Sequence, residues 1–245
     1  MNAIETKGLT KVFGRKVAVD HIDLTVGEGE LFALLGVNGA GKTTTIRMLS
    51  GLSAPTEGTC SVCGHDCVTE KPQVKEIIGL SPQDTAVAEN LTVLENLQFM
   101  AQVHGLSGEA KRQQVQEMIH QFRMEEVLDS RAKTLSGGWK RKLSIAMALI
   151  SQPKVLFLDE PTLGLDVLAR RELWRVIEGL KGKVTVLLTT HYMEEAEHLA
   201  DRIAVMIAGR MAAVGTLPQL EEMTGKTGLE EAFVAIAEGS VGQDA

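Results

Sequence analysis

The chain has 245 residues, of which 44% are hydrophobic and 23% charged, so it can bury the core of one large domain, with or without an insertion. Its formal net charge of -7 argues against a general nucleic-acid-binding protein, which usually carries a basic excess. No secretory signal or membrane span is expected, because MNAIETKG lacks a basic start before an apolar core and runs such as VLFL are short.

The first part of the chain, residues 1–35, predicts a β-rich segment. Short β-type runs alternate with turn signals such as Glu28-Gly29, and they end in the continuous apolar run of residues 31–35. Directly after this predicted buried strand, the glycine-rich stretch GVNGAGKTTTIRMLSGL takes on a helical character. The order strand, loop, helix is the context in which a phosphate-binding loop occurs.

That loop, residues 36–43, carries the complete phosphate-loop pattern GxxxxGK[ST]. Its glycines let successive backbone N–H groups point at a β-phosphate, and the following helix adds its positive end. Lys42 is expected to reach the β- and γ-phosphates, and Thr43 is expected to place its hydroxyl on Mg²⁺. The nucleotide-binding residues predicted in this loop are Gly36, Asn38, Gly39, Ala40, Gly41, Lys42, Thr43 and Thr44.

The cysteines fall together in the stretch TCSVCGHDC, where His65 lies between Cys63 and Cys67. A zinc site is one interpretation, and small apolar strand residues are the other. The second is favoured, because zinc sites usually combine ligand pairs from separate turns. With no signal peptide expected, the cysteine content indicates a reducing, cytosolic compartment.

Helices are predicted within residues 90–128, where Val115, Met118, Ile119 and Phe122 recur at the spacing of one helix face. The chain then resumes with the apolar runs of KVLFLDEP and KVTVLLTTH, which are typical of strands buried on both faces of a parallel sheet. A hairpin-like segment, RIAVMIAGRMAAVG, follows.

Two acidic residues follow the strand predicted at residues 155–158. Asp159 and Glu160 would lie at the C-terminal edge of the sheet, where ligands of open α/β folds bind. Asp159 is expected to hold Mg²⁺ through water, and Glu160 is expected to act as general base on the attacking water. A phosphate loop alone leaves a GTPase, a small-molecule kinase and an ATPase open, but no guanine-reading NKxD segment occurs, which disfavours GTP.

The segments GVNGAGKTT, LSGGWKRK, VLFLDEPTLGLD and TTHYMEEAEHLADR resemble, in order and spacing, the ATP-binding subunit of ABC transporters over almost the whole chain. Residues 135–138, LSGG, resemble the signature of that family. The resemblance implies that two subunits pack head to tail, so that Ser136, Gly137 and Gly138 of one contact the γ-phosphate held by the phosphate loop of the other. A serine with glycine N–H groups at a helix start suits a terminal phosphate.

The resemblance implies further roles, one residue at a time. Phe13 falls where the family places an aromatic ring, most often tyrosine, against adenine. Gln83 in LSPQD matches the glutamine that reaches Mg²⁺ and the attacking water. Asp166 matches the loop that crosses the dimer interface, and His191 matches the switch histidine at the γ-phosphate. The predicted catalytic residues are Glu160, His191 and Gln83, and the predicted Mg²⁺ ligands are Thr43, Gln83 and Asp159.

One position departs from the family pattern. Trp139 follows the signature where a polar residue, often glutamine, is usual, and it is expected to pack against the ribose or the partner subunit, or to weaken a hydrogen bond. Two interpretations are open for the adjacent Lys140, Arg141 and Lys142: an ordinary solvated helix face, or an electrostatic contribution near the phosphates.

Together with the predicted elements, the resemblance implies an α/β fold. It consists of a phosphate-loop NTPase core with a mainly parallel sheet, an N-terminal antiparallel β subdomain and an inserted α-helical subdomain. The chain would form one ABC ATPase domain over residues 1–245. Its expected parts are the core with the β subdomain (1–83 and 153–220), a helical subdomain carrying the signature (84–152) and a short C-terminal tail (221–245).

The function implied by the resemblance is ATP hydrolysis, with ATP and Mg²⁺ as cofactors, coupled to transport through ATP-dependent dimerisation. The implied partners are separate transmembrane permease subunits and a second ATPase subunit, expected to be identical, at the cytoplasmic face of the cell membrane; no nucleic acid is expected. The ending GRMAAVGTLPQLEEMTGKTGLEEAF resembles exporter-type subunits that handle drugs, lipids or polysaccharides. The alternative is a soluble ABC ATPase acting in ribosome function, DNA repair or iron–sulfur assembly.

Overall fold

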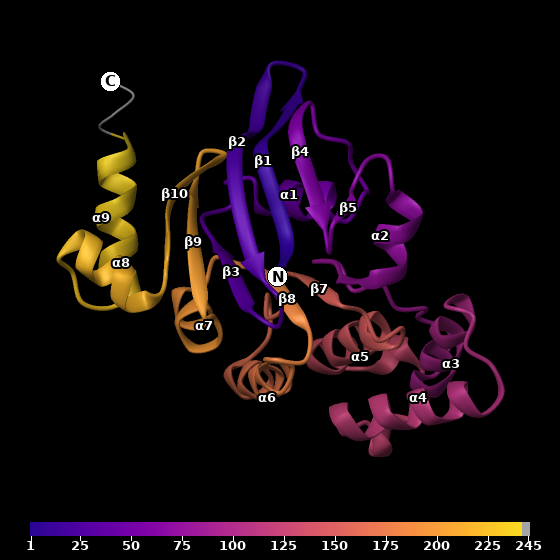
Figure 1. Ribbon diagram of the computed structural model, residues 1–245. Coiled ribbons are helices and arrows are strands. Elements are labelled where there is room, and N and C mark those ends of the chain that lie inside the picture. The colour runs from indigo at the N-terminus through magenta and orange to yellow at the C-terminus, as the bar shows by residue number, and fades with distance from the viewer. Residues whose placement is uncertain (242–245) are drawn as a thin grey trace.

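The structure is a computed structural model that describes residues 1–241, and the strands in these residues form two sheets (Figure 1). The six-stranded sheet has, in spatial order, β10 (Arg210–Gly215), β9 (Arg202–Ile207), β3 (Leu31–Leu35), β8 (Thr185–Thr190), β7 (Val155–Asp159) and β6 (Ile78–Ser81). The four-stranded sheet has β2 (Lys16–Gly27), β1 (Asn2–Phe13), β4 (Glu57–Val62) and β5 (His65–Asp66).

The six-stranded sheet is parallel except at one edge. β3 pairs in parallel with β8 on one side and β9 on the other, and β7 pairs in parallel with β8 and β6. Only β10 is antiparallel, because it returns from β9 through a tight hairpin. The four-stranded sheet is antiparallel throughout its pairings.

Each central strand of the parallel sheet contributes to two separate cores. Along β3, Leu31, Ala33 and Leu35 belong to one hydrophobic cluster, whereas Phe32 and Leu34 belong to the other. Successive side chains of a strand point to opposite faces, so a strand covered on both faces is apolar at most of its positions. This accounts for the continuous apolar runs in the sequence.

The helices of residues 1–241 lie on both faces of the six-stranded sheet and beside its two edge strands, β10 and β6 (Figure 1). They are α1 (Lys42–Leu49), α2 (Lys71–Ile77), α3 (Val93–Val103), α4 (Gly108–Phe122), α5 (Gly137–Leu149), α6 (Val167–Glu178), α7 (Met193–Leu199), α8 (Leu217–Thr224) and α9 (Leu229–Val241), with short 3-10 turns at Glu125–Val127 and Ala132–Thr134. None of them is both long and apolar enough to cross a membrane.

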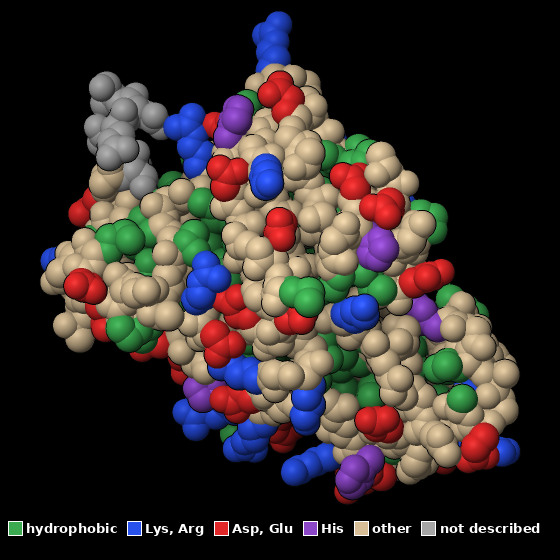
Figure 2. Space-filling view, in the orientation of Figure 1, with side chains coloured by type: hydrophobic (Ala, Val, Ile, Leu, Met, Phe, Trp, Pro, Cys, Tyr) green, Lys and Arg blue, Asp and Glu red, His purple; other side chains and the backbone are tan. Residues whose placement is uncertain are grey.

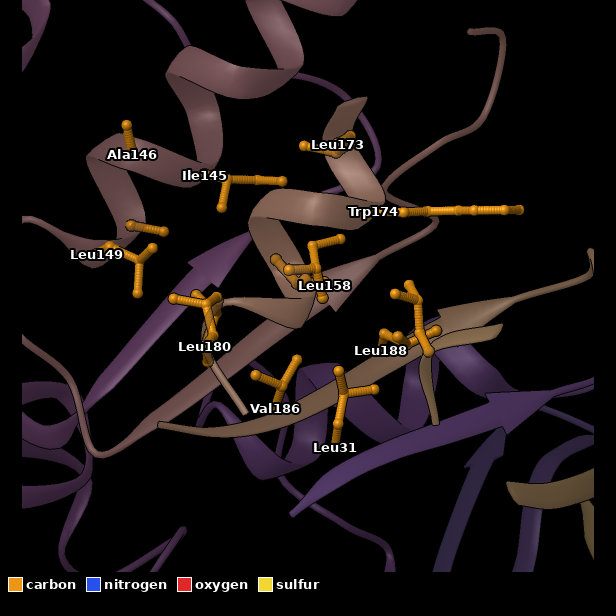
Figure 3. Packing of buried hydrophobic residues seen from close by; sticks show 14 of the residues in the cluster. Leu31, Ile145, Ala146, Leu149, Leu158, Leu173, Trp174, Leu180, Val186 and Leu188 are labelled. Atoms are coloured by element: carbon orange, nitrogen blue, oxygen red, sulfur yellow. The ribbon is translucent and has the colours of Figure 1, made fainter. Parts of the chain in front are cut away.

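One core lies between the parallel sheet and helices α5 and α6. Figure 3 shows Leu158 and Val186 of the strands facing Ile145 and Leu149 of α5, with Leu173 of α6 close by. Burial of each such side chain stabilises the fold by about 1.5 to 3 kcal/mol relative to exposure. The second core lies on the opposite side of the sheet, where Cys60 is a buried residue of β4 and Cys67 is buried in the turn that follows β5.

The predicted fold class is confirmed: the protein is α/β, with a mainly parallel sheet, an antiparallel sheet from the N-terminal part and a group of helices. Helices α3, α4 and α5 are inserted between β6 and β7, which are neighbours in the sheet. The subdomain boundaries stay a prediction. Residues 221–241 of the predicted tail include the end of α8 and all of α9, and its last four residues lie outside the described part.

Charged side chains of both signs are interspersed on the face shown in Figure 2. This distribution agrees with the modest net negative charge of the chain.

Candidate functional site

The glycine-rich loop connects β3 to α1, and it packs closely against neighbouring backbone. A Cβ atom at Gly36 would lie 2.4 Å from the carbonyl oxygen of Met206, and one at Gly41 would lie 2.4 Å from that of Ala18. Gly41 also has a φ of 106°, which side chains disfavour, so both positions require glycine. The loop thereby delivers the N-terminus of α1, with its unpaired N–H groups, to the edge of the sheet.

Lys42, the first residue of α1, folds back over this loop. Its Nζ donates to the carbonyl oxygens of Gly36 at 2.7 Å and Val37 at 3.3 Å. The same Nζ lies 3.1 Å from Glu160 Oε1, and both side chains are only 5% exposed. A lysine charge held inside a loop of N–H groups is suited to a phosphate.

Asp159 ends β7 and connects two hydroxyl groups. The Thr43 hydroxyl donates to its Oδ1 at 3.0 Å, and the Thr189 hydroxyl of β8 donates to the same oxygen at 2.6 Å. Hydroxyl and carboxylate oxygens are the ligands that Mg²⁺ prefers. The donor set of Thr43 and Asp159 therefore fits a Mg²⁺ ion bound together with a nucleotide.

Glu160 follows Asp159 in an unusual backbone conformation. Its φ is 51°, in the left-handed region, which costs a non-glycine residue about 1 to 2 kcal/mol. Its N–H group donates to both the carbonyl and the hydroxyl oxygen of Thr189, each at 3.1 Å. Its Oε2 lies 2.5 Å from Nδ1 of His191, which directly follows β8. A buried carboxylate is thus held between a lysine and a histidine.

The signature residue Ser136 and the predicted interface residue Asp166 lie at the N-termini of two neighbouring helices, α5 and α6. Ser136 caps α5 by accepting a hydrogen bond from the N–H group of Trp139 at 3.4 Å. Asp166 caps α6 by accepting from Leu168 and Ala169 at 2.9 and 3.0 Å. The two helix starts touch, because a Cβ atom at Gly138 would lie 3.1 Å from that of Ala169.

Two further predicted residues occupy exposed positions. Phe13 ends β1 with 54% of its surface exposed, and Lys11 Nζ lies 5.1 Å from its ring centroid. Gln83 is exposed just beyond β6, and its carbonyl oxygen accepts a hydrogen bond from Arg141 Nη2 at 2.7 Å. The structure therefore brings only part of the predicted site into one hydrogen-bonded network. The members of that network are Lys42, Thr43, Asp159, Glu160 and His191, whereas Phe13, Gln83, Ser136 and Asp166 lie outside it.

The residues that follow the signature on α5 are packed against other parts of the same chain. Lys142 Nζ lies 4.5 Å from the ring centroid of Trp139 and 2.7 Å from Glu172 of α6. Trp139 is therefore packed against its own chain, beside a groove between α4, α5 and α6. Arg141 is only 4% exposed, so the solvated-face interpretation is wrong for this residue.

Sequence reasoning missed two buried residues near the network, Thr189 and Glu195. Glu195 of α7 is fully buried, and Trp174 Nε1 donates to its Oε1 at 3.2 Å. Burial raises the pKa of Glu195 above its ordinary value of 4.5; the charge of Glu160 acts in the same direction, while nearby hydroxyls and the indole oppose it. Helical spacing is the signal in the sequence that could have indicated the burial of Glu195, because Glu195 shares a helix face with the buried Leu199.

Known proteins resemble this chain over most of its length. The model of the ABC transporter family matches residues 19–163. The daunorubicin/doxorubicin resistance ATP-binding protein DrrA of Streptomyces peucetius is 45% identical over 224 residues, which cover 91% of this chain and 68% of DrrA. The phospholipid-transporting ATPase ABCA3 of Rattus norvegicus is 45% identical over 226 residues, and the chain spans only 13% of its length.

Solved structures share the whole fold. The ATP-binding subunit of an ABC transporter superposes with a TM-score of 0.86 and 31% identity, covering 96% of this chain and 99% of that chain. A dimeric ATP-binding cassette in a post-hydrolysis state, bound to ADP and Pi, superposes with a TM-score of 0.78 and 25% identity, covering 87% and 98%.

Proposed function

The chain belongs to the ABC transporter family and is an ATPase of that family, and from this premise we propose that it powers an exporter. Relatives named for drug resistance and for Nod factor export support the direction of transport. The observation that carries the proposal is the buried Glu160 carboxylate, held by Lys42 and His191 beside the phosphate loop.

ATP binding is proposed to use the loop and the exposed ring of Phe13. The β- and γ-phosphates would be bound by Lys42 and by the N–H groups of residues 38–44, at the positive end of α1. Phe13 has the exposure that a ring needs to stack on adenine. Because Lys11 Nζ lies over one face of the Phe13 ring, adenine would stack on the other face.

Mg²⁺ is proposed to bind with ATP through Thr43, Asp159 and Gln83. The bound ion supplies positive charge to the β- and γ-phosphates. The hydroxyl of Thr43 and the carboxylate of Asp159 support this role by their mutual contact at 3.0 Å. The hydroxyl of Thr189 orients Asp159 through its hydrogen bond. The side chain of Gln83 is exposed, while Arg141 holds its backbone carbonyl group.

Glu160 is proposed to act as the general base in hydrolysis. Water attacks the γ-phosphorus, its proton passes to the Glu160 carboxylate, and the bond between that phosphorus and the oxygen of ADP breaks. His191 is proposed to orient the carboxylate and to contact the γ-phosphate. The strained φ of Glu160 supports a functional role, because such conformations persist where the surroundings enforce them.

A second ATPase subunit is proposed to complete each site. Ser136, Gly137, Gly138 and Asp166 lie together on a surface outside the network around Lys42, as a contribution to a partner's nucleotide would require. Beside them, Val167 and Leu168 are exposed apolar residues at the start of α6. A dimeric neighbour bound to ADP and Pi supports the same arrangement.

A transmembrane subunit is the second partner that we propose, at the cytoplasmic face of the membrane. Phe99 and Val103 lie one helical turn apart on α3 and are 51% and 60% exposed. Exposed apolar side chains at this spacing form a compact docking surface. No observation in residues 1–241 favours the alternative, a soluble ABC ATPase, over this reading.

The variant Glu160→Gln tests the proposal. It should bind ATP and form an ATP-dependent dimer, while turnover falls by about a hundredfold or more, because the proton of the attacking water loses its acceptor. Phosphate release and light scattering measure the two properties. The matched control is Glu109→Gln, an exposed carboxylate on α4, which should leave both unchanged. Undiminished turnover in Glu160→Gln would contradict the proposed role.

A further inference from the structure

Helix α5 is fastened to strand β6 along one helix face. The Arg141 guanidinium donates from Nη1 to the carbonyl oxygen of Pro82 and from Nη2 to that of Gln83, both at 2.7 Å. One turn further on, the hydroxyls of Ser144 and Ser81 lie 2.9 Å apart. These contacts join the helix to the segment that leads directly into the Gln83 loop.

The backbones make direct contact at the far end of the same face. A Cβ atom at Gly79 of β6 would lie 2.3 Å from the carbonyl oxygen of Ala148, so helix and strand touch without an intervening side chain. Arg141, Ser144 and Ala148 have the spacing of one helix face. Helix α5 and the end of β6 are therefore joined by side-chain hydrogen bonds and by direct backbone contact.

Arg141 also contacts the neighbouring strand end. Its Nη2 lies 3.4 Å from the carbonyl oxygen of Glu160, which follows β7. Buried carbonyl groups need hydrogen-bond donors, and a charged donor makes the stronger bond. The almost fully buried guanidinium of Arg141 thus contacts the backbone carbonyl oxygens of both Gln83 and Glu160.

The same helix begins with the signature. Ser136 caps α5 five residues before Arg141, which corresponds to about 7.5 Å along the helix axis. A backbone shift at Gln83 or Glu160 would therefore be passed through Arg141 to Ser136 by a short, rigid segment. In a head-to-tail dimer, Ser136 contacts the nucleotide of the other site.

We propose that Arg141 is a positioning residue that couples the chain's own hydrolysis site to the signature that it contributes to its partner's site. The inference rests on the proposed function, because it requires a dimer with two shared sites. Arginine suits the task, since its planar fork reaches two carbonyl groups at once, whereas lysine supplies a single point charge.

The test compares Arg141→Met and Arg141→Lys with the unaltered chain and with Arg112→Met, an exposed arginine on α4. Phosphate release is measured against ATP concentration. For both Arg141 variants, the Hill coefficient should fall to about one, the value for independent sites, and turnover should fall by roughly tenfold to a hundredfold. Arg112→Met should keep the cooperativity of the unaltered chain.

A merely structural role predicts a different result. Loss of packing would lower the melting temperature of Arg141→Met, but the folded fraction would keep the cooperativity of the unaltered chain. Arg141→Lys separates the two cases, because it retains a long cationic side chain while losing the two-carbonyl fork. Unaltered cooperativity in both folded variants, checked by circular dichroism, would overturn the inference.

A second measurement separates this inference from the proposed function. Glu160→Gln and the double variant Glu160→Gln/Arg141→Met are mixed with ATP and followed by light scattering and by binding of a fluorescent ATP analogue. The double variant should bind the analogue equally well but need about tenfold more ATP to dimerise. Equal dimerisation of the two would overturn the inference alone. Absence of an ATP-dependent dimer of Glu160→Gln would overturn the proposed function as well.

Discussion

At the scale of single residues, the network around Glu160 is held by groups that are themselves buried. Thr189 accepts from the N–H group of Glu160 and donates to Asp159, so one hydroxyl fixes both acidic residues. Behind them, Glu195 accepts a hydrogen bond from Trp174, and its pKa is raised by burial and by the charge of Glu160. Folding therefore shifts the protonation equilibrium of Glu195 toward its neutral form relative to the unfolded chain.

Replacing Glu195 with glutamine should stabilise the protein increasingly as the pH rises. A carboxyl group with a raised pKa contributes its full stability below its ordinary value of 4.5 and loses that contribution as the pH rises through the folded-state value. Glutamine is neutral and isosteric, and it avoids this loss. Melting temperatures of both proteins, from below 4.5 to neutral pH, should therefore diverge in favour of Glu195→Gln.

Glu197→Gln is the matched control, because it makes the same change at an exposed position of the same helix. It should leave the pH dependence of the melting temperature unchanged. If the difference in melting temperature between Glu195→Gln and the unaltered protein were the same at every pH, the prediction would be wrong. That result would show that the pKa of Glu195 is the same in the folded and the unfolded state.

At the scale of elements, the contact between α5 and β6 positions both Gln83 and the signature. Gly79 permits this contact, since any side chain there would meet the backbone of Ala148. Strand β6 lies at the edge of the parallel sheet and pairs only with β7 among the described strands. Its place therefore depends on α5 as well as on one row of backbone hydrogen bonds.

Replacing Gly79 with alanine should destabilise the fold by about 1 to 3 kcal/mol, because the new methyl group must displace the helix backbone. Urea unfolding followed by circular dichroism measures the change. Gly239→Ala in α9 is the control: no atom lies within 4 Å of the added Cβ, and alanine favours the helix by up to about 1 kcal/mol. Equal stability of both variants would contradict the close contact.

At the scale of the whole molecule, two exposed apolar pairs lie on different elements. Val167 and Leu168 begin α6 beside the signature, whereas Phe99 and Val103 lie on α3 at the end of the molecule formed by α3 and α4 (Figure 1). Because they are on different elements, the first pair can contribute to the proposed subunit interface while the second docks on a transmembrane subunit.

The docking proposal predicts which protein is recovered from cell membranes with a tagged Glu160→Gln chain in mild detergent and ATP. A polytopic membrane protein should be recovered in near-equal amount. The added substitutions Phe99→Asp and Val103→Asp should remove it without affecting ATP binding, because they desolvate a charge at the interface. Val234→Asp, at an exposed position of α9, is the control and should retain the partner. Recovery of soluble partners alone would favour the soluble ATPase.

Much of the fold and part of the candidate site were predictable because their signals are local. The apolar run of residues 31–35 predicted a buried strand, and that of residues 155–158 predicted a strand buried on both faces of a parallel sheet. The helix face of α4 was predicted from its spacing. The loop of residues 36–43 was recognisable from its motif, although the contacts that require glycine at Gly36 and Gly41 come from the distant Met206 and Ala18. Asp159 and Glu160 were placed at a strand end by their position in the chain.

Local residue patterns predicted the order of elements and put the phosphate loop, Asp159 and Glu160 at the sheet edge, because periodicity and loop chemistry act over a few residues. The α/β fold class rested on these elements together with the family resemblance. Only the packing of the folded chain places Arg141 against Pro82 and Gln83 and buries Glu195 beside Trp174. These contacts join segments far apart in the chain. From the sequence, a charged residue beside the signature is expected to be solvated. In the folded chain, the packing of α5 on β6 removes water from Arg141, and backbone carbonyl groups take the place of that water.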